Sequence, residues 1–206
     1  MNVTVRPLAT TPAASRLSVI DCDIHPARST PDALAPYLEQ RWQDLAATFG
    51  TPRRLGYQEG VAYPKGQPNA ARRDAWPPEG GPPGSSLPFM QAQHLEPNGV
   101  AFGILNPLGA TGQGFRNLDL AAAYARAVND WQIAEWVGRD ARLRASVVVS
   151  YEAPPAAVAE IERRAGDRAF AQVLLLTRTA APLGQRQYWP IYEAAAAAGL
   201  PVGIHA

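Results

Sequence analysis

The sequence has almost no cysteine, no long apolar run and no excess of charge of either sign. Cys22 is the only cysteine among 206 residues, so no disulfide can form within the chain. No apolar stretch approaches the roughly 20 residues that a helix needs to span a bilayer. The segment Met1–Val19 lacks the apolar stretch of a signal peptide. These absences favour a cytoplasmic protein that has no membrane partner.

Charge is nearly balanced, with 19 basic and 18 acidic residues, a formal net charge of +1 and no basic block. This balance argues against a dedicated binder of nucleic acid or of anionic membranes. Hydrophobic residues make up 47% of the chain, which is too many for a disordered protein. The length is sufficient for one domain with a real core.

The distribution of proline and glycine divides the chain into zones. Residues 1–16 are rich in Thr, Ala and Pro and predict a flexible tail. An apolar strand over 17–25 follows. Residues 26–98 hold most of the prolines, so we expect an insertion with little regular structure apart from a helix near Pro31–Phe49. Because this insertion follows the first strand, it would emerge at the C-terminal edge of that strand and serve as a lid or pocket wall.

From Gly99 onward the pattern becomes regular, and short apolar strands alternate with helices. Strands are predicted at 17–24, 100–105, 143–149, 170–176 and 200–205, and helices at 117–137, 154–165 and 189–198. Nearly continuous apolar strands that are separated by helices are typical of a parallel sheet covered by helices.

Ionisable side chains are concentrated in the first strand. Because side chains alternate along a strand, Asp21, Asp23 and His25 are predicted to share one face. Ile20 and Cys22 would share the other face, which suits burial against helices. Charged groups on a buried face are costly unless they are neutralised, and a divalent metal at the C-terminal end of the strand would neutralise them. Carboxylate and imidazole suit zinc, manganese or iron, with Asp21 placed deeper as a supporting residue.

Other interpretations of this strand remain open. The Asp-Cys-Asp-Ile-His run by itself equally allows a strand end that turns into solvent, with Asp23 capping the turn before Pro26. A metallophosphoesterase can also begin with Asp-x-His after a strand. No Gly-Asp-x-x-Asp or Gly-Asn-His motif follows here, so that possibility is set aside.

The last predicted strand also ends on a histidine, His205, with Gly203 on the same face. A single histidine at a strand end is more often structural than a ligand. However, all strand C-termini of a parallel barrel lie at one rim, so His25 and His205 are expected to converge. Their convergence favours a metal site that also includes Asp23.

Six segments carry a resemblance to a known family, in order and at fitting spacing. They are Ile20–Pro26, Gly99–Leu105, Asn129–Trp131, Pro182–Gly184, Tyr188–Ala195 and Gly199–His205. Together they resemble the amidohydrolase-related family of the amidohydrolase superfamily, which includes aminocarboxymuconate-semialdehyde decarboxylase and resorcylate decarboxylase. The first position of the opening motif is Asp23, where many members have His, and this variant is similar to the decarboxylase-like branch.

The resemblance implies an α/β fold, a partial TIM (β/α)₈ barrel over residues 17–206 with about five of eight strands. It implies that Asp23 and His25 are metal ligands from the first strand and that His205 is the ligand from the fifth. Zinc is the first expectation for the metal, with manganese or iron as alternatives. The remaining catalytic groups of the family, usually a His on strand six and an Asp on strand eight, belong to later strands.

The expected function is metal-dependent hydrolysis or decarboxylation of a small carboxylated or carbonyl-bearing cyclic molecule. A bound metal would lower the pKa of water to about 7 for hydrolysis, or orient a carboxylate for decarboxylation. Asn106, just past the second strand, and Arg178, after the fourth, are candidates for substrate contact. Arg53 and Arg54 are interpreted as surface charges rather than substrate anchors, and His94 as a loop or helix-end residue without a role in the site.

Five strands do not complete a barrel, which needs eight strands and about 250 residues. The predicted strands 17–24 and 200–205 would be open apolar edges that invite pairing with another chain. We therefore expect a complementing chain that carries the C-terminal barrel strands, a homo-oligomer, or a fragment of a longer protein. The alternatives are a non-catalytic structural or regulatory subunit, an inactive fragment, and an open doubly wound sheet that is stable alone.

Overall fold

A computed structural model describes residues 18–52, 71–109 and 111–205 of the chain. Its centre is a sheet of five parallel strands in the order in which they occur in the sequence. The strands are β1 (Val19–Ile24), β2 (Val100–Leu105), β3 (Leu143–Val148), β4 (Phe170–Leu176) and β5 (Val202–His205). Each strand pairs with the next, so the chain winds in one direction around half of a barrel. The predicted partial TIM-type α/β fold is confirmed.

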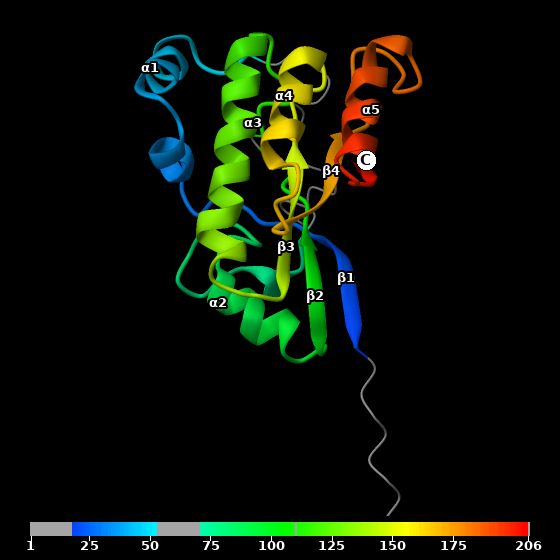
Figure 1. Cartoon of the computed structure of the whole chain (residues 1–206). Helices are drawn as coiled ribbons and strands as arrows, with labels where there is room; N and C mark the ends of the chain where they lie inside the picture. Colours follow the sequence, from blue (N-terminus) through cyan, green and yellow to red (C-terminus); the bar gives the residue numbers. More distant parts are fainter. Residues whose placement is uncertain (1–17, 53–70, 110, 206) are drawn as a thin grey trace, which may run out of the picture.

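Helices follow the strands, as predicted, and α3, α4 and α5 stand side by side along the sheet (Figure 1). They are α3 (Leu118–Gln132), which continues as the π-helix η6 (Ile133–Val137), α4 (Pro154–Arg164) and α5 (Trp189–Ala197), preceded by η7 (Arg186–Tyr188). Local chemistry fixes where they begin. The Asn117 side chain accepts hydrogen bonds from the first backbone amides of α3, and Pro154 and Pro190 occupy first-turn positions in α4 and α5.

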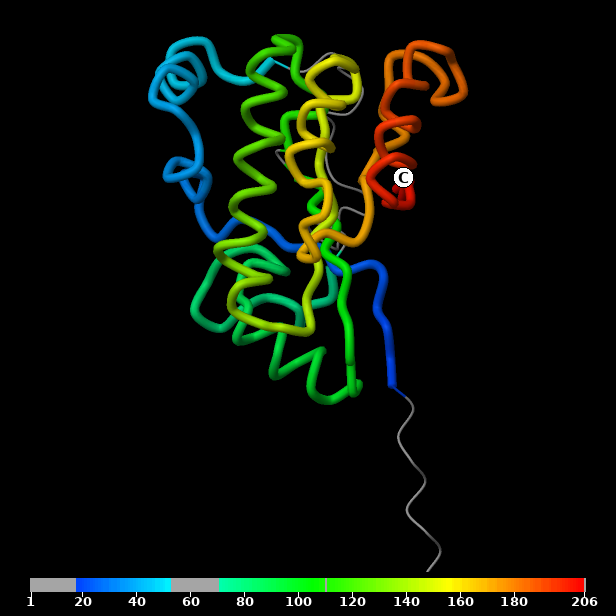
Figure 2. Tube along the Cα trace, in the orientation of Figure 1, coloured from blue at the N-terminus to red at the C-terminus, as the bar shows by residue number. Residues whose placement is uncertain are grey.

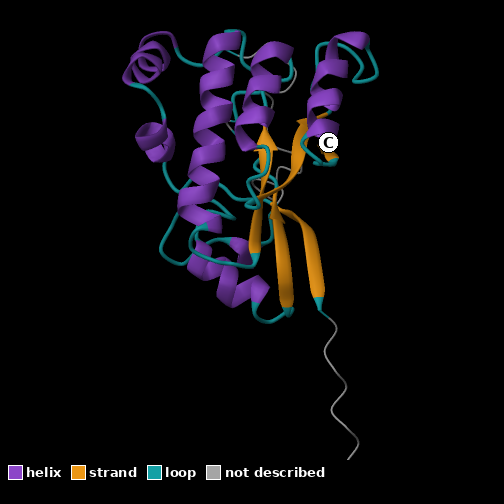
Figure 3. Ribbon diagram, viewed as in Figure 1, coloured by secondary structure: helices purple, strands orange, loops and turns teal. Residues whose placement is uncertain are grey.

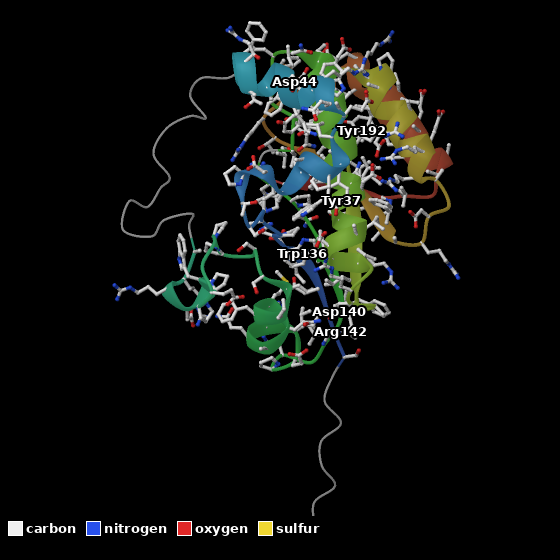
Figure 4. All side chains as sticks on the ribbon, turned by 90° about the vertical axis from the view of Figure 1, so that its left-hand side faces the viewer. Tyr37, Asp44, Trp136, Asp140, Arg142 and Tyr192 are labelled. Carbon is white, nitrogen blue, oxygen red and sulfur yellow. The ribbon has the colours of Figure 1, made fainter. Side chains whose placement is uncertain are left out.

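The core lies between the sheet and these helices in two large clusters of buried side chains. One cluster joins Ile24 and Leu105 to Trp131 and Trp136, and the other packs β3 and β4 against α4 and α5. The two tryptophans are 5% and 2% exposed, with ring centroids 6.0 Å apart in an edge-to-face arrangement. Both tryptophans belong to the core, and Figure 4 shows Trp136 beside α3.

The insertion after β1 contains more regular structure than expected. The described elements are η1 (Pro31–Tyr37), α1 (Gln40–Phe49), η4 (Arg73–Ala75), α2 (Leu87–Met90) and the π-helix η5 (Gln91–Leu95). The single helix predicted near residues 31–49 is two helices, because Leu38 is extended between them. The unpredicted segment α2–η5 begins where Ser86 caps the amide of Phe89. The expected tail at 1–16 and the residues Arg53 and Arg54 lie outside the described residues.

Strand β1 is irregular, which changes the prediction for its faces. Asp21 pairs with Gly103 and Ile24 with Leu105, so β1 holds one more residue than β2 over this stretch. This bulge interrupts the alternation of side chains. Ile24 is buried at 4% exposure, but Ile20 is 62% exposed and Cys22 is also exposed. The expected burial of Ile20 and Cys22 is therefore wrong.

The sheet ends at β1 on one side and at β5 on the other, within the described residues. In Figures 2 and 3 the path of β1 lies along the border of the molecule, with no helix beyond it. Ile20 and its register partner Phe102 are 62% and 43% exposed, and Ile204 on β5 is 57% exposed. The prediction of two apolar edges is thus confirmed. No helix of the described residues is long and apolar enough to cross a membrane.

Candidate metal centre

Asp23, His25 and His205 come together at the C-terminal ends of β1 and β5. Among the described residues they form a cluster in which one ligand atom from each lies within 4.8 Å of the others. Asp23 Oδ2 is 3.5 Å from His25 Nε2, and Asp23 Oδ1 is 3.4 Å from His205 Nε2. The two imidazole rings meet edge to face, with centroids 4.9 Å apart. The outermost strands of the sheet therefore curl towards each other at this rim.

The proton position of His25 follows from its partner. His25 Nδ1 lies 3.0 Å from the backbone carbonyl oxygen of Asn106. A carbonyl oxygen only accepts hydrogen bonds, so Nδ1 carries the proton. In the neutral ring the lone pair is then on Nε2, which faces Asp23. This is the arrangement by which proteins orient an imidazole towards a metal.

Asn106 is 4% exposed and lies at the centre of the polar contacts beneath the cluster. Its Nδ2 donates to the carbonyl of Cys22 at 2.9 Å and to Asp23 Oδ1 at 3.1 Å. Its Oδ1 accepts from Ser146 Oγ and from Gln172 Nε2, both at 2.8 Å. Both hydrogens and both lone pairs of the amide are thus engaged within the chain.

Next to this amide lies a cavity of about 270 Å³, and its walls include both Asn106 and two of the clustered residues, Asp23 and His205. Asn106 therefore lies beside the cavity, and its contact with a substrate stays a prediction. Arg178 is exposed two residues beyond β4, and its carbonyl accepts a hydrogen bond from the Tyr151 hydroxyl at 3.3 Å. Arg178 does not line this cavity, and its contact with a substrate stays a prediction.

His94 contacts strand β1, although the sequence indicated no role for it. Its Nε2 lies 2.7 Å from Asp21 Oδ2, and its Nδ1 accepts from Asn98 Nδ2 at 3.2 Å. The other oxygen of Asp21 accepts the backbone amide of Asp23 at 3.0 Å. Asp21 thus connects the π-helix η5 to the backbone of a clustered residue, and its supporting role at a metal stays a prediction. No local pattern indicates this contact, because 73 residues separate His94 from Asp21.

The donor set suits a divalent cation. One carboxylate and two imidazoles are the ligands that zinc, manganese and iron accept in proteins. Their side chains are 58%, 43% and 24% exposed for Asp23, His25 and His205, so the cluster is open on one side. An open side leaves coordination positions for water or substrate, which a catalytic centre requires and a closed structural site lacks.

A family model described as Amidohydrolase matches residues 20–206. The chain belongs to the amidohydrolase family. No curated protein matches this amidohydrolase in sequence. Its resemblance to that family, inferred from the ordered segments, is confirmed.

Solved structures with similar folds include several decarboxylases. The 5-carboxyvanillate decarboxylase from Novosphingobium aromaticivorans, complexed with manganese and 4-hydroxy-3-methoxy-5-nitrobenzoic acid, is 18% identical, with a TM-score of 0.59 over 94% of this chain and 51% of that chain. The dihydroxybenzoic acid decarboxylase from Polaromonas sp. JS666, with bound manganese and 2-nitroresorcinol, is 20% identical. Its TM-score is 0.58 over 90% of this chain and 48% of that chain. The 2,6-dihydroxybenzoate decarboxylase from Rhizobium is 18% identical, with a TM-score of 0.54 over 90% of this chain and 48% of that chain.

At these identities the similarity shows the fold of the amidohydrolase and not its substrate. The chain spans about half the length of the solved structures that it matches.

Proposed function

We propose that this amidohydrolase chain binds one divalent metal through Asp23, His25 and His205. The observation that supports the proposal is the convergence of one carboxylate and two imidazoles from the two outermost strands, within 4.8 Å of one another. Manganese is present in two of the similar decarboxylases, so it is a candidate beside zinc and iron.

We further propose that this centre serves the decarboxylation of a small cyclic carboxylic acid, with hydrolysis of a carbonyl-bearing ring as the alternative. The similar structures of aromatic-acid decarboxylases favour the first reaction. A metal bound there would supply a Lewis acid that orients a substrate carboxylate or acidifies water. A panel of hydroxybenzoic acids, lactones and amides distinguishes the two reactions, and turnover of phosphoesters alone would overturn both.

The chain's own residues would divide the remaining work. The backbone carbonyl of Asn106 keeps the proton on Nδ1 of His25, so the lone pair of Nε2 stays available to a metal ion. The carboxylate of Asp23 supplies negative charge beside the two imidazoles. The cavity of about 270 Å³ beside Asp23, Asn106 and His205 would receive part of a small substrate. Arg178 is proposed as a contact for a substrate carboxylate, since a guanidinium can bind both carboxylate oxygens.

The metal assignment is tested by removing ligands one at a time. We expect His25→Ala and His205→Ala to reduce the metal content of the purified chain strongly, as measured by inductively coupled plasma mass spectrometry. Asp44→Ala on α1 is the control, because this carboxylate is exposed and lies outside the cluster. Full metal occupancy in both ligand variants would show that the assignment is wrong. A wild-type chain that binds no metal would instead favour a non-catalytic subunit.

We propose a second polypeptide as the partner, one that contributes further barrel strands at the edges of β1 and β5. The exposed apolar side chains of Ile20, Phe102 and Ile204 on the sheet support this proposal. Co-expression with the other half of such a barrel should yield a complex with higher metal affinity than the chain alone. A second copy of the chain is the alternative, and light scattering distinguishes the two.

A further inference from the structure

We propose that Asn106 is a positioning residue, which sets the geometry of the first-strand ligands before a metal arrives. The proposal rests on the proposed metal site and adds a role for a residue that coordinates nothing itself. Asn106 lies directly after β2, and three of its polar groups contact the four consecutive residues from Cys22 to His25 at the end of β1.

These contacts cover the whole irregular stretch of β1. The side-chain amide of Asn106 donates to the carbonyl of Cys22 and to the carboxylate of Asp23. Its backbone amide donates to the carbonyl of Ile24 at 2.6 Å, and its backbone carbonyl accepts from His25 Nδ1. The extra residue of β1 lies between Asp21 and Ile24, where strand pairing alone does not fix the backbone. Asn106 supplies the missing constraint at the point where the two ligands leave the strand.

The direction of the amide is determined by residues behind it. Ser146 Oγ accepts a hydrogen bond from Gln172 Nε2 at 3.0 Å. The hydroxyl hydrogen of Ser146 is therefore available to Asn106 Oδ1, and the two oxygens are 2.8 Å apart. Gln172 Nε2 also donates to Asn106 Oδ1. A flipped Asn106 amide would place its NH₂ against the NH₂ of Gln172 and its oxygen against the acceptors of Cys22 and Asp23. The donor must therefore face the carboxylate.

Strand β5 leaves room for this arrangement. A Cβ atom on Gly203 would lie 2.6 Å from Oε1 and 3.0 Å from Nε2 of Gln172. Gly203 is two residues before His205, so the absence of a side chain there lets Gln172 reach Asn106 beneath the ligand of the fifth strand. One network therefore connects β1, β2, β3 and β4 and is shaped by β5. Supporting hydrogen bonds of this kind orient ligands, and their loss typically weakens metal binding about 10–100-fold.

The test compares two buried asparagines. Asn129 is 0% exposed, donates to the carbonyl of Val148 and to Glu160, and accepts from the amide of Val148. It therefore resembles Asn106 in burial and hydrogen bonding but lies away from the ligands. We expect Asn106→Leu to weaken Zn²⁺ binding to the 206-residue chain about 10–100-fold in calorimetry, at a temperature at which the metal-free protein is folded. Asn129→Leu should lower the melting temperature without changing the affinity per folded molecule.

Milder variants and a coupling measurement keep the test decisive. If either leucine variant fails to fold, Asn106→Ser and Asn129→Ser replace the pair, with the same expected contrast. A positioning role also requires coupling through the carboxylate, so Asn106→Ser should cost no further affinity in an Asp23→Ala chain that retains the two histidines. A role in folding alone would not produce this dependence on Asp23.

The outcomes separate this proposal from the proposed function. If the wild-type chain binds Zn²⁺ and the Asn106 variants bind it equally tightly, the positioning role is wrong and the metal site stands. The same conclusion follows if the Asn106 and Asn129 variants lose affinity in parallel with stability. If the wild-type chain binds no Zn²⁺, the metal site and the positioning role fall together.

Discussion

Single side chains in this protein often connect segments that lie far apart in the sequence. Asp140 is an example near the start of β3, and its side chain is 6% exposed. Its carboxylate accepts hydrogen bonds from the backbone amide and the guanidinium of Arg142 and from the Gln91 side chain of η5. Figure 4 shows Asp140 and Arg142 together beside Trp136. The pair connects the insertion to the central sheet.

Hydrogen bonds from Arg142 hold the pKa of Asp140 well below its usual value. A depressed folded-state pKa means that the stabilisation is present above the unfolded pKa of about 3.9 and is lost as pH falls towards the folded value. We predict that Asp140→Asn lowers the free energy of unfolding by about 1–3 kcal/mol at pH 7. The difference from wild type should shrink below about pH 4.

Urea denaturation across the acid range measures this effect. Asp44→Asn on α1 is the control, because Asp44 is exposed and accepts only from the exposed side chain of Gln40, among the hydrogen bonds of the described residues. The control should remain within about 0.5 kcal/mol of wild type at every pH. If the difference in free energy of unfolding between wild type and Asp140→Asn stays constant from neutral to acid pH, the ionic origin of the stabilisation is contradicted.

At the scale of elements, the start of α3 depends on a tight approach of the preceding loop. Gly112 has φ +82°, which favours glycine, and a Cβ there would lie 2.6 Å from the carbonyl oxygen of Ala121 and 2.7 Å from Tyr124 Cβ. The loop then reaches Asn117, whose side chain accepts the amides of Asp119 and Leu120. The position of α3 over the sheet is thus fixed from its first turn.

We predict that Gly112→Ala destabilises the protein by more than about 1 kcal/mol, because both the backbone conformation and the space exclude a side chain. Gly109→Ala is the matched control in the same loop, since Gly109 has open space around its Cβ position. Thermal unfolding followed by circular dichroism compares the two. Equal melting temperatures for both variants would mean that the loop moves away from α3 without cost.

At the scale of the whole molecule, both edges of the sheet are uncovered within the part of the chain that the structure describes. Val19 and Ile20 on β1 are 39% and 62% exposed, and Ile204 on β5 is 57% exposed. Unpaired apolar edge strands promote association with other strands, and a charged residue on such an edge suppresses it. The isolated half-barrel should therefore associate in solution unless a partner covers these strands.

We predict concentration-dependent association of the isolated chain in multi-angle light scattering, and a marked decrease in the Ile204→Lys variant. Phe49→Lys is the control: Phe49 is 72% exposed but lies at the end of α1, away from the sheet, so its replacement should leave association unchanged. A chain that is monomeric at all concentrations and fully active would contradict both the association and the proposed partner.

The secondary structure could be predicted from the sequence because its signals are local. The predicted limits of the five strands agree with the observed ones to within about two residues, since continuous apolar runs mark buried parallel strands. Two helical segments of the insertion were not predicted correctly. The segment η1–α1 was merged into one helix and contains prolines, and the segment α2–η5 was missed and contains a proline and a π-helix. Such sequences lack the regular period on which helix prediction depends.

The sequence by itself determined the half-barrel, the family and the residues expected to meet at its rim. Parallel strands all end at one edge, so a strand that ends at His25 and one that ends at His205 converge whatever the details of packing. Only the tertiary structure decided how these residues are held. The contacts of Asn106 with Cys22, and of His94 with Asp21, join residues 84 and 73 positions apart, and they depend on a bulge that breaks the alternation of β1. No local pattern encodes such contacts, because each requires strands and helices to be packed first.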